Sequence, residues 1–382
     1  MESFFAKFDF YEIVVWIATI IMCAIAAACK RVPLRRPGGL GQPLPNPVAV
    51  VLPIVFFTVF VALRKTIGDT FYYMHSFELL PDNNPVNIEL FFTVMFGFFQ
   101  NIIRNMTDDP QWLVAFSAVF SIPVPLIILY RYCPRFEMAI FMFVAFSYLG
   151  GAMNGMRQYM ATSIFLLATR YLFSEKKTDF IKYAVIVLLA YCMHNSAMVL
   201  LPLYFVVRRK AWQLGSYLMI VASAVGVIAF DAFLPSFLGA VEQTSFSVYS
   251  QNGWFTSGTE GGSSLIRVLF IAYPVVIAYL NKEKFKMLGR VGDILINIAF
   301  VDIAIYMIAM YNWIFARFAI YLAIYFMIFT IWTVNYAVKP KDRSLYVFIT
   351  IIVFFIYYRM DAYTISGYES DYFMPGRKLF RI

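Results

Sequence analysis

The sequence predicts an all-α fold, a polytopic helical membrane bundle with about 11–12 membrane segments. Of its 382 residues, 62% are hydrophobic and only 14% are charged, whereas soluble domains carry about a quarter charged residues. Apolar runs of roughly 17 to 25 residues alternate with short polar turns, which is the pattern of membrane-spanning helices. The alternating segments of a transmembrane β-barrel are not found. Residues 1–382 are therefore expected to form a single transmembrane domain.

Short basic loops between the apolar runs set the expected orientation. Lys- and Arg-rich loops stay in the cytoplasm, so the N- and C-termini are expected outside. The net charge of +9 is spread over these loops and does not form a nucleic-acid surface. The first run follows acidic residues and is expected to be retained, since a signal peptide begins with basic ones. The expected segments are Tyr11–Cys29, Pro47–Leu63, Trp112–Tyr130, Met138–Met153, Arg157–Phe173, Tyr183–Val207, Leu214–Phe233, Leu265–Leu280, Val291–Met310, Ile314–Val338 and Leu345–Tyr358.

One segment, residues 183–207, does not fit a simple span. Both of its flanks are basic, and 25 residues are too few for two full spans. A hairpin of two short helices that turns at Met193–Ser196 satisfies both facts, and one long tilted helix is the alternative. Two loops are expected on the outer side. Residues 64–111 form the first, which contains an interfacial helix at Asn87–Ile103, and residues 234–264 form the second.

Several polar side chains are expected at the outer membrane boundary. A cluster of arginines there suits a polyanionic, lipid-anchored ligand, because guanidinium forks bind phosphate oxygens and keep their charge. Asp69 and His194 are the groups able to accept a proton from a hydroxyl nucleophile. The cluster consists of Arg64 and Asp69 with Tyr72, Asn154 with Arg157 and Gln158, His194 with Asn195, Arg317 and Arg267.

Each of these residues also has a structural explanation. A single arginine at the end of a span usually extends to the interface, and a lone histidine usually packs in a core. Asp69 could cap a helix. Asp302 lies in the middle of a span, where a buried partner or a water cavity is expected. No Cys or His spacing typical of a metal site occurs, so neither a metal nor another cofactor is expected.

Four short motifs resemble the EpsG-like branch of the bacterial Wzy-type polysaccharide polymerases. The first combines Arg64, Gly68, Asp69 and Tyr72, and the second is Met156-Arg157-Gln158 with Ala161. The third is Met193-His194-Asn195-Ser196-Ala197 followed by Leu201–Tyr204. The fourth is Arg317 with Tyr321. The resemblance covers most of Pro47–Val207 and the late span. Thr66-Ile67 and Thr70-Phe71 around the aspartate depart from the usual family pattern.

The resemblance implies a metal-independent, inverting glycosyltransferase of the GT-C type at the outer face of the bacterial inner membrane. It would polymerise oligosaccharide repeat units carried on polyprenyl (undecaprenyl) diphosphate, for O-antigen, capsule or exopolysaccharide. The implied diphosphate ligands are Arg157, Arg317, Arg64 and Gln158, and His194 or Asp69 is the base. Asn154, Tyr72, Asn195 and Tyr321 would contact substrate. A flippase and a chain-length regulator are the implied protein partners.

Other functions remain open from the sequence. A flippase or transporter of lipid-linked oligosaccharides would line a central cavity with cations, whereas the expected cations gather at one face. A ligase that moves finished glycan to another acceptor shares the donor chemistry. An O-acyltransferase and a non-enzymatic assembly subunit complete the alternatives.

Overall fold

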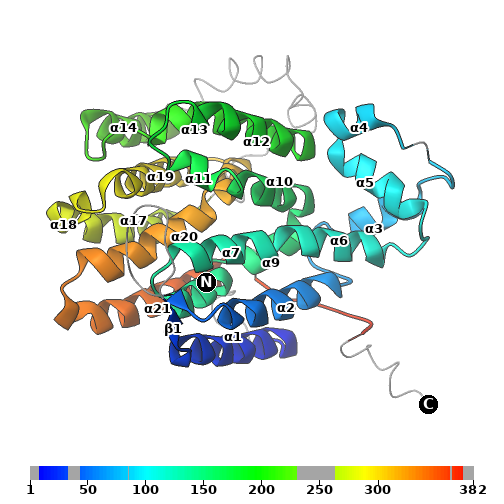
Figure 1. The fold of residues 1–382 in the computed structure, drawn as a ribbon, viewed down its shortest axis with the longest axis horizontal. Coiled ribbons are helices and arrows are strands. Elements are labelled where there is room, and N and C mark those ends of the chain that lie inside the picture. The colour runs from blue at the N-terminus through cyan, green and yellow to red at the C-terminus, as the bar shows by residue number, and fades with distance from the viewer. Residues whose placement is uncertain (1–7, 33–43, 85, 230–262, 362–363, 373–382) are drawn as a thin grey trace. The chain divides into compact units, whose positions relative to one another are not determined.

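The structure, a computed structural model, describes residues 8–32, 44–84, 86–229, 263–361 and 364–372. In these ranges the regular structure is helical except for two short antiparallel strands, β1 (Arg31–Val32) and β2 (Leu44–Pro45). The prediction of an all-α fold is therefore confirmed (Figure 1). The expected outer loop 234–264 lies outside the described residues except for its last two.

The chain divides into two compact units, of which the first comprises Met1–Leu201 and Val347–Ile382. In this unit α1 packs on α2 and α8, and α2 packs on α6 and α7; Figure 1 shows α1 and α2 side by side. Its helices are α1 (Phe10–Ala28), α2 (Val48–Ala62), α3 (Thr70–Glu78), α4 (Ile88–Thr93), α5 (Met95–Arg104), α6 (Gln111–Ser121), α7 (Pro123–Tyr132), α8 (Phe136–Ala145), α9 (Tyr148–Asn154), α10 (Met156–Leu166), α11 (Thr169–Leu172), α12 (Asp179–Met193) and η2 (Asn195–Val199).

The second unit comprises Pro202–Tyr346. At its centre is α19, which packs against α14, α17, α20 and η3. Its helices are α13 (Leu200–Val207), α14 (Leu214–Ile228), α17 (Leu265–Leu280), α18 (Lys282–Lys286), α19 (Gly289–Ile308), η3 (Trp313–Tyr321), α20 (Ala323–Trp332), η4 (Thr333–Ala337), η5 (Pro340–Asp342) and the start of α21 (Arg343–Met360), most of which belongs to the first unit.

The length and polarity of the helices identify a multi-pass membrane protein. Within the described ranges, four helices are long and apolar enough to cross a membrane, and six if each bent pair counts as one span. The four are Phe10–Ala28, Gln111–Tyr132, Gly289–Ile308 and Pro340–Met360. Shorter apolar helices of 10–17 residues add Val48–Ala62, Asn195–Val207, Leu214–Ile228 and Leu265–Leu280.

Several expected spans are interrupted. The span expected at Met138–Met153 breaks between α8 and α9, which are bent by 47°, where Ser147 takes a positive φ of 55°. The span expected at Ile314–Val338 begins as a 3-10 helix, bends by 66° and ends in a π-helical turn. The helix expected at Asn87–Ile103 is not continuous, because Val94 leaves the helical conformation between α4 and α5. Hydrophobic patterning does not register such breaks, since the apolar residues continue through them.

Hydrogen bonds gather distant loops at one end of the first unit. The Lys65 amide donates to the Glu369 carbonyl (2.8 Å), and the Gly367 amide donates to the Asp9 carboxylate (2.9 Å). Asp9 also caps α1 through the Glu12 amide (2.8 Å). This end of the unit therefore holds the start of α1, the segment after α2 and residues 364–372.

Basic loops lie at the opposite end of the first unit. The Arg31 guanidinium donates to the Pro134 carbonyl (3.0 Å), and the Tyr130 hydroxyl donates to the Pro45 carbonyl (2.8 Å). The loops that follow α1 and α7 therefore meet there. This is the segregation that the positive-inside rule describes for helices that alternate in direction.

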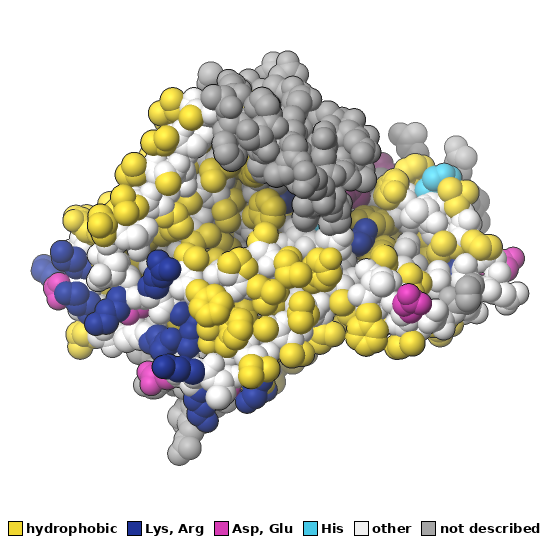
Figure 2. Space-filling model, turned by 90° about the horizontal axis from the view of Figure 1, so that it is seen from above, with side chains coloured by type: hydrophobic (Ala, Val, Ile, Leu, Met, Phe, Trp, Pro, Cys, Tyr) yellow, Lys and Arg dark blue, Asp and Glu magenta, His cyan; other side chains and the backbone are white. Residues whose placement is uncertain are grey.

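The second unit also gathers its basic loops at one end. Lys284 donates to the Ala337 carbonyl (2.8 Å), which joins the loops after α17 and α20. The Ala211 backbone amide donates to the Asp293 carboxylate (3.1 Å) in the first turns of α19, which brings in the loop after α13. Figure 2 shows Lys and Arg side chains in dark blue among broad hydrophobic areas of the surface.

This segregation yields a test of membrane orientation. Met106 (80% exposed) lies in the expected outer loop, and Met287 (85% exposed) lies in a basic loop. In a variant whose four native cysteines are serines, we expect Met106→Cys to react with a membrane-impermeant maleimide in intact cells. Met287→Cys should react only after permeabilisation. Labelling in the reverse order contradicts the orientation.

Candidate functional site

The candidate site of the first unit begins at Arg64, just beyond the end of α2. Arg64 is fully buried, and its Nε donates to the Thr70 hydroxyl (2.9 Å) while Nη1 donates to the Val61 carbonyl (2.7 Å). Burial lowers the pKa of the Arg64 guanidinium to about 9, so the group keeps its charge at neutral pH. Its Nη2 is buried without a hydrogen-bond partner in the described structure. Arg64 therefore holds the loop together and retains one donor.

Gly68 and Asn154 join this loop to the end of α9. Ile67 and Gly68 both have positive φ, 81° and 53°. A Cβ atom on Gly68 would lie 1.9 Å from the Asn154 Oδ1 atom, so only glycine fits. The same oxygen accepts a hydrogen bond from the Asp69 amide (3.1 Å). Asn154, expected to contact substrate, thus also holds Asp69 in place.

Asp69 stands at the first position before α3, yet its carboxylate does not cap that helix. It is half-buried, and within the described part of the chain no hydrogen bond or ion pair reaches its carboxylate. A carboxylate next to a fixed backbone and without a partner is available to accept a proton.

Arg157 lies in the first turn of α10, three residues after Asn154. Its guanidinium lies over the Phe96 ring at 5.7 Å, and its Nε is buried with no hydrogen-bond partner. Among the described residues Arg157 makes no ion pair or hydrogen bond through its side chain. A half-buried guanidinium without a counter-ion is costly and favours an anionic ligand.

The chain reverses direction at His194. The Tyr183 hydroxyl donates to the Leu200 carbonyl (2.6 Å), although 17 residues of continuous helix would separate them by about 25 Å. The helix α12 ends at Met193, His194 is extended, and the 3-10 helix η2 begins at Asn195. The capping interactions at His194 satisfy backbone groups at this break.

His194 lies near the level of Asn154 and Arg157. The helices α10 and α12 pack together, and the Phe165 and Tyr183 rings meet at 6.0 Å. Because the two helices are antiparallel neighbours, His194, 11 residues after Tyr183, lies at about the level of Met156, nine residues before Phe165 at the start of α10, since the two helical paths are about 16 and 14 Å long. The turn η2 itself packs against α10.

The hydrogen bonds of His194 indicate which ring nitrogen carries the proton. Its Nδ1 accepts from the Ser196 amide (3.3 Å) and lies 2.7 Å from the Ser196 hydroxyl. A backbone amide can only donate, so in a neutral imidazole the proton resides on Nε2. His194 is then a hydrogen-bond donor through Nε2.

The remaining expected residues of the first unit differ in exposure. Gln158 is buried (3% exposed), whereas Tyr72 is 69% exposed on α3. Asn195 is half-buried in the first position of η2. Thus the structure brings Arg64, Asp69 and Asn154 together directly, and Tyr72 follows them on α3.

Arg317, Tyr321, Arg267 and Asp302 belong to the second unit. The Arg317 guanidinium lies over the Trp313 ring at 4.9 Å, and Tyr321 is fully buried. Asp302 is fully buried, and neither carboxylate oxygen has a hydrogen-bond partner. The partner expected for Asp302 is therefore not found among the described residues. A meeting of Arg317 with Arg157 stays a prediction.

Sequence reasoning missed two supporting residues. The Thr70 hydroxyl donates to the Ile67 carbonyl (2.7 Å) and accepts from Arg64, which ties the loop to α3. Phe96 on α5 supports the Arg157 guanidinium. Neither residue type is diagnostic of a site, and the motif around Asp69 was the one signal that pointed near Thr70. Within the described ranges no group of three or more His, Cys, Asp or Glu residues is placed to hold a metal ion.

Comparison with known families decides the membership of this chain. The profile of the EpsG family matches residues 48–375, which include every residue of the site. The chain belongs to the EpsG family. Comparison with curated proteins and with solved structures finds no match. The EpsG membership supports a membrane protein of the polysaccharide polymerase type.

The contact between Gly68 and Asn154 generates a stability prediction. In Gly68→Ala the new Cβ atom overlaps Asn154, and an L-residue in the left-handed region costs about 1–2 kcal/mol. We expect a lower thermal unfolding temperature in detergent. Gly226→Ala is the control, because a Cβ atom there meets nothing within 4 Å. Equal unfolding temperatures for the two variants would contradict this role of Gly68.

Proposed function

We propose that this EpsG-family protein is an inverting, metal-independent glycosyltransferase that polymerises lipid-linked oligosaccharide repeat units. The donor is the growing chain on a polyprenyl diphosphate, and the acceptor is a hydroxyl of the next lipid-linked unit. The observation that carries the proposal is the half-buried, unpaired guanidinium of Arg157 beside a loop that presents the unpaired carboxylate of Asp69. A cation and a proton acceptor are the two groups that this transfer needs.

Arg157 stabilises the leaving group in this mechanism. When the bond between the donor's anomeric carbon and the diphosphate oxygen breaks, its electron pair stays on the diphosphate. A guanidinium fixed in a partly desolvated place stabilises this growing negative charge more than water does. Arg64 contributes its remaining donor, and Gln158 and Arg317 are assigned to the same diphosphate.

Asp69 is the base in this proposal. The acceptor hydroxyl attacks the anomeric carbon opposite the leaving diphosphate, which inverts the configuration, and its proton passes to the Asp69 carboxylate. His194 cannot take that proton through Nδ1, which already accepts from Ser196. His194 is instead assigned to a substrate contact. Asn154, Tyr72, Asn195 and Tyr321 are assigned to sugar contacts.

The proposed location is the outer face of the bacterial inner membrane. The basic loops of the first unit lie at the end opposite Asp69, and this arrangement supports an outer site by the positive-inside rule. Repeat units arrive there through a flippase, and a chain-length regulator is the further expected partner.

A reconstitution assay tests the function and the role of Arg157. Purified protein incubated with a synthetic lipid-linked repeat unit is expected to produce a ladder of polymers. Arg157→Ala should lower the rate by about 10²–10³, the usual effect of removing one transition-state donor. Arg131→Ala removes the same charge from the exposed, opposite end and should leave the ladder intact.

The outcomes of this assay separate the alternatives. Transport of the intact unit across vesicles without a ladder would identify a flippase instead. Transfer of a finished glycan to a different acceptor would identify a ligase. A normal ladder from Arg157→Ala contradicts the mechanism.

A second pair of variants distinguishes the base. Asp69→Asn should lower the rate by about 10²–10⁴, as loss of a general base does, and should flatten the rise of rate with pH. His194→Gln keeps an acceptor for Ser196 and a donor for substrate, so it should retain most activity. The comparison uses pH–rate profiles of both purified variants. The opposite ranking of the two variants assigns the base to His194.

A further inference from the structure

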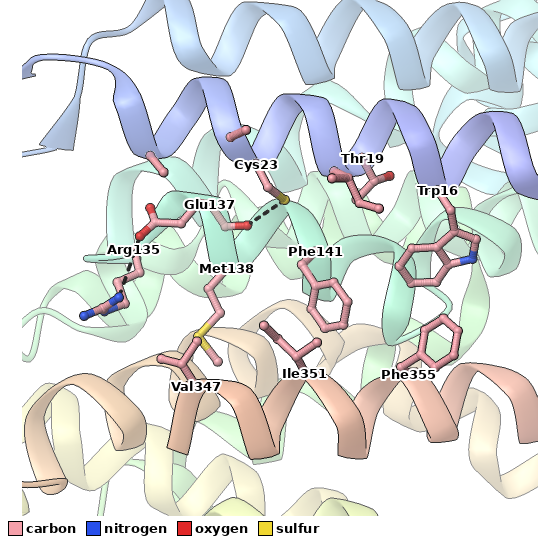
Figure 3. Close-up of a pocket in the computed structure, with 13 residues that line it drawn as sticks. Trp16, Thr19, Cys23, Arg135, Glu137, Met138, Phe141, Val347, Ile351 and Phe355 are labelled. Atoms are coloured by element: carbon pink, nitrogen blue, oxygen red, sulfur yellow. Dashed lines mark hydrogen bonds and ion pairs between the residues drawn. The ribbon is translucent and has the colours of Figure 1, made fainter. Parts of the chain in front are cut away.

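An apolar groove lies in the first unit between α1, α8 and α21, at a distance from the candidate site. Its volume is about 510 Å³, and it is open on one side. Figure 3 shows α1 and α21 as its two walls, with α8 between them. The lining residues are Trp16, Thr19, Ile20, Cys23, Ala24, Ala27, Arg135, Glu137, Met138, Phe141, Val347, Ile351 and Phe355.

The walls of the groove suit a hydrocarbon chain. The two polar side chains along α1 already use their hydrogens, since Thr19 donates to the Val15 carbonyl (2.7 Å) and Cys23 to the Glu137 carbonyl (3.1 Å). The other lining residues are aliphatic or aromatic, apart from Arg135 and Glu137 at the basic end. A polar ligand would lose its hydration in such a place without replacement.

The length of the groove corresponds to one leaflet. Along α1 it extends from Trp16 to Ala27, and 11 residues of helix span about 16 Å. The hydrocarbon core of a bilayer is about 30 Å thick. The groove therefore begins at the basic end of α1 and reaches the middle of the membrane, as one acyl chain does.

The charged residues of the groove stand at its basic end. Glu137 contacts two guanidinium groups, Arg31 at 3.5 Å and Arg135 at 4.0 Å. Two arginines and one carboxylate leave a net positive charge, and both arginine side chains are about one third exposed (35% and 34%). Guanidinium groups at the membrane surface bind phosphate oxygens.

We propose that this groove binds an anionic phospholipid of the leaflet on the basic-loop side. One acyl chain occupies the groove between α1 and α21, and the phosphate lies against Arg31 and Arg135. The lipid is a structural ligand of the first unit and is distinct from the lipid-linked substrate, whose diphosphate is assigned to the opposite end. The proposal does not depend on the glycosyltransferase activity.

Native mass spectrometry tests the proposal on the full chain. Protein from nanodiscs of equal phosphatidylglycerol and phosphatidylethanolamine is released into mild detergent, and the retained lipids are counted. Ala24 is exposed within the groove, so Ala24→Trp fills the groove without disturbing the core. We expect about tenfold less retained phosphatidylglycerol, because the acyl chain of the lipid loses its buried contacts with the groove. Ala27→Trp is a second groove-filling variant.

Two matched controls make the result specific. Ile21→Trp adds the same ring on a lipid-facing side of α1 (53% exposed) outside the groove and should retain phosphatidylglycerol. Arg135→Gln should remove the preference for phosphatidylglycerol over phosphatidylethanolamine. Arg131→Gln, in the last turn of α7 and outside the groove, should keep it.

Three outcomes overturn the proposal. Equal retention by wild type, Ala24→Trp and Ile21→Trp shows adventitious lipid only. Displacement of phosphatidylglycerol by an added polyprenyl phosphate assigns the groove to the substrate lipid. Dimers that dissociate in Ala24→Trp assign it to a second copy of the chain.

Discussion

The need to satisfy backbone hydrogen bonds without water shapes this structure. In hydrocarbon a helix satisfies its own peptide groups, so each interruption needs a substitute partner. The described breaks show such partners: His194 accepts from the Ser196 amide, and Asn312 accepts from the Ile314 amide (2.9 Å). After α2, the Arg64 side chain binds the Val61 carbonyl. These side chains are held rigidly because the backbone depends on them.

The same constraint explains why the polar groups of the first unit lie where they do. A carboxylate or guanidinium is tolerable at the ends of helices, where the chain already leaves the hydrocarbon. Asn154 lies at such a helix end, just before α10 begins, and its side-chain oxygen accepts a hydrogen bond from the Asp69 backbone amide. Rigid supports for a few reactive groups are what catalysis by positioning and charge requires.

Short motifs predicted the EpsG relationship, and hydrophobic patterning and loop charge were sufficient to predict the all-α membrane fold. They were insufficient for the breaks at Ser147 and Val94, where apolar residues continue while the backbone changes direction. Short motifs pointed to Arg157 and Asp69, but not to their supports. Phe96 and Thr70 act through tertiary contacts, and no local pattern distinguishes such contacts from ordinary packing.

The solitary charge of Arg157 has a thermodynamic consequence for the protein as a whole. A cation held partly out of water, with no counter-charge in the described structure, weakens the empty fold. A phosphorylated ligand that supplies the missing counter-charge binds the native state alone, and so raises resistance to heat as its concentration rises above its dissociation constant. The thermal stability of the protein therefore reports ligand binding even when no sugar is transferred.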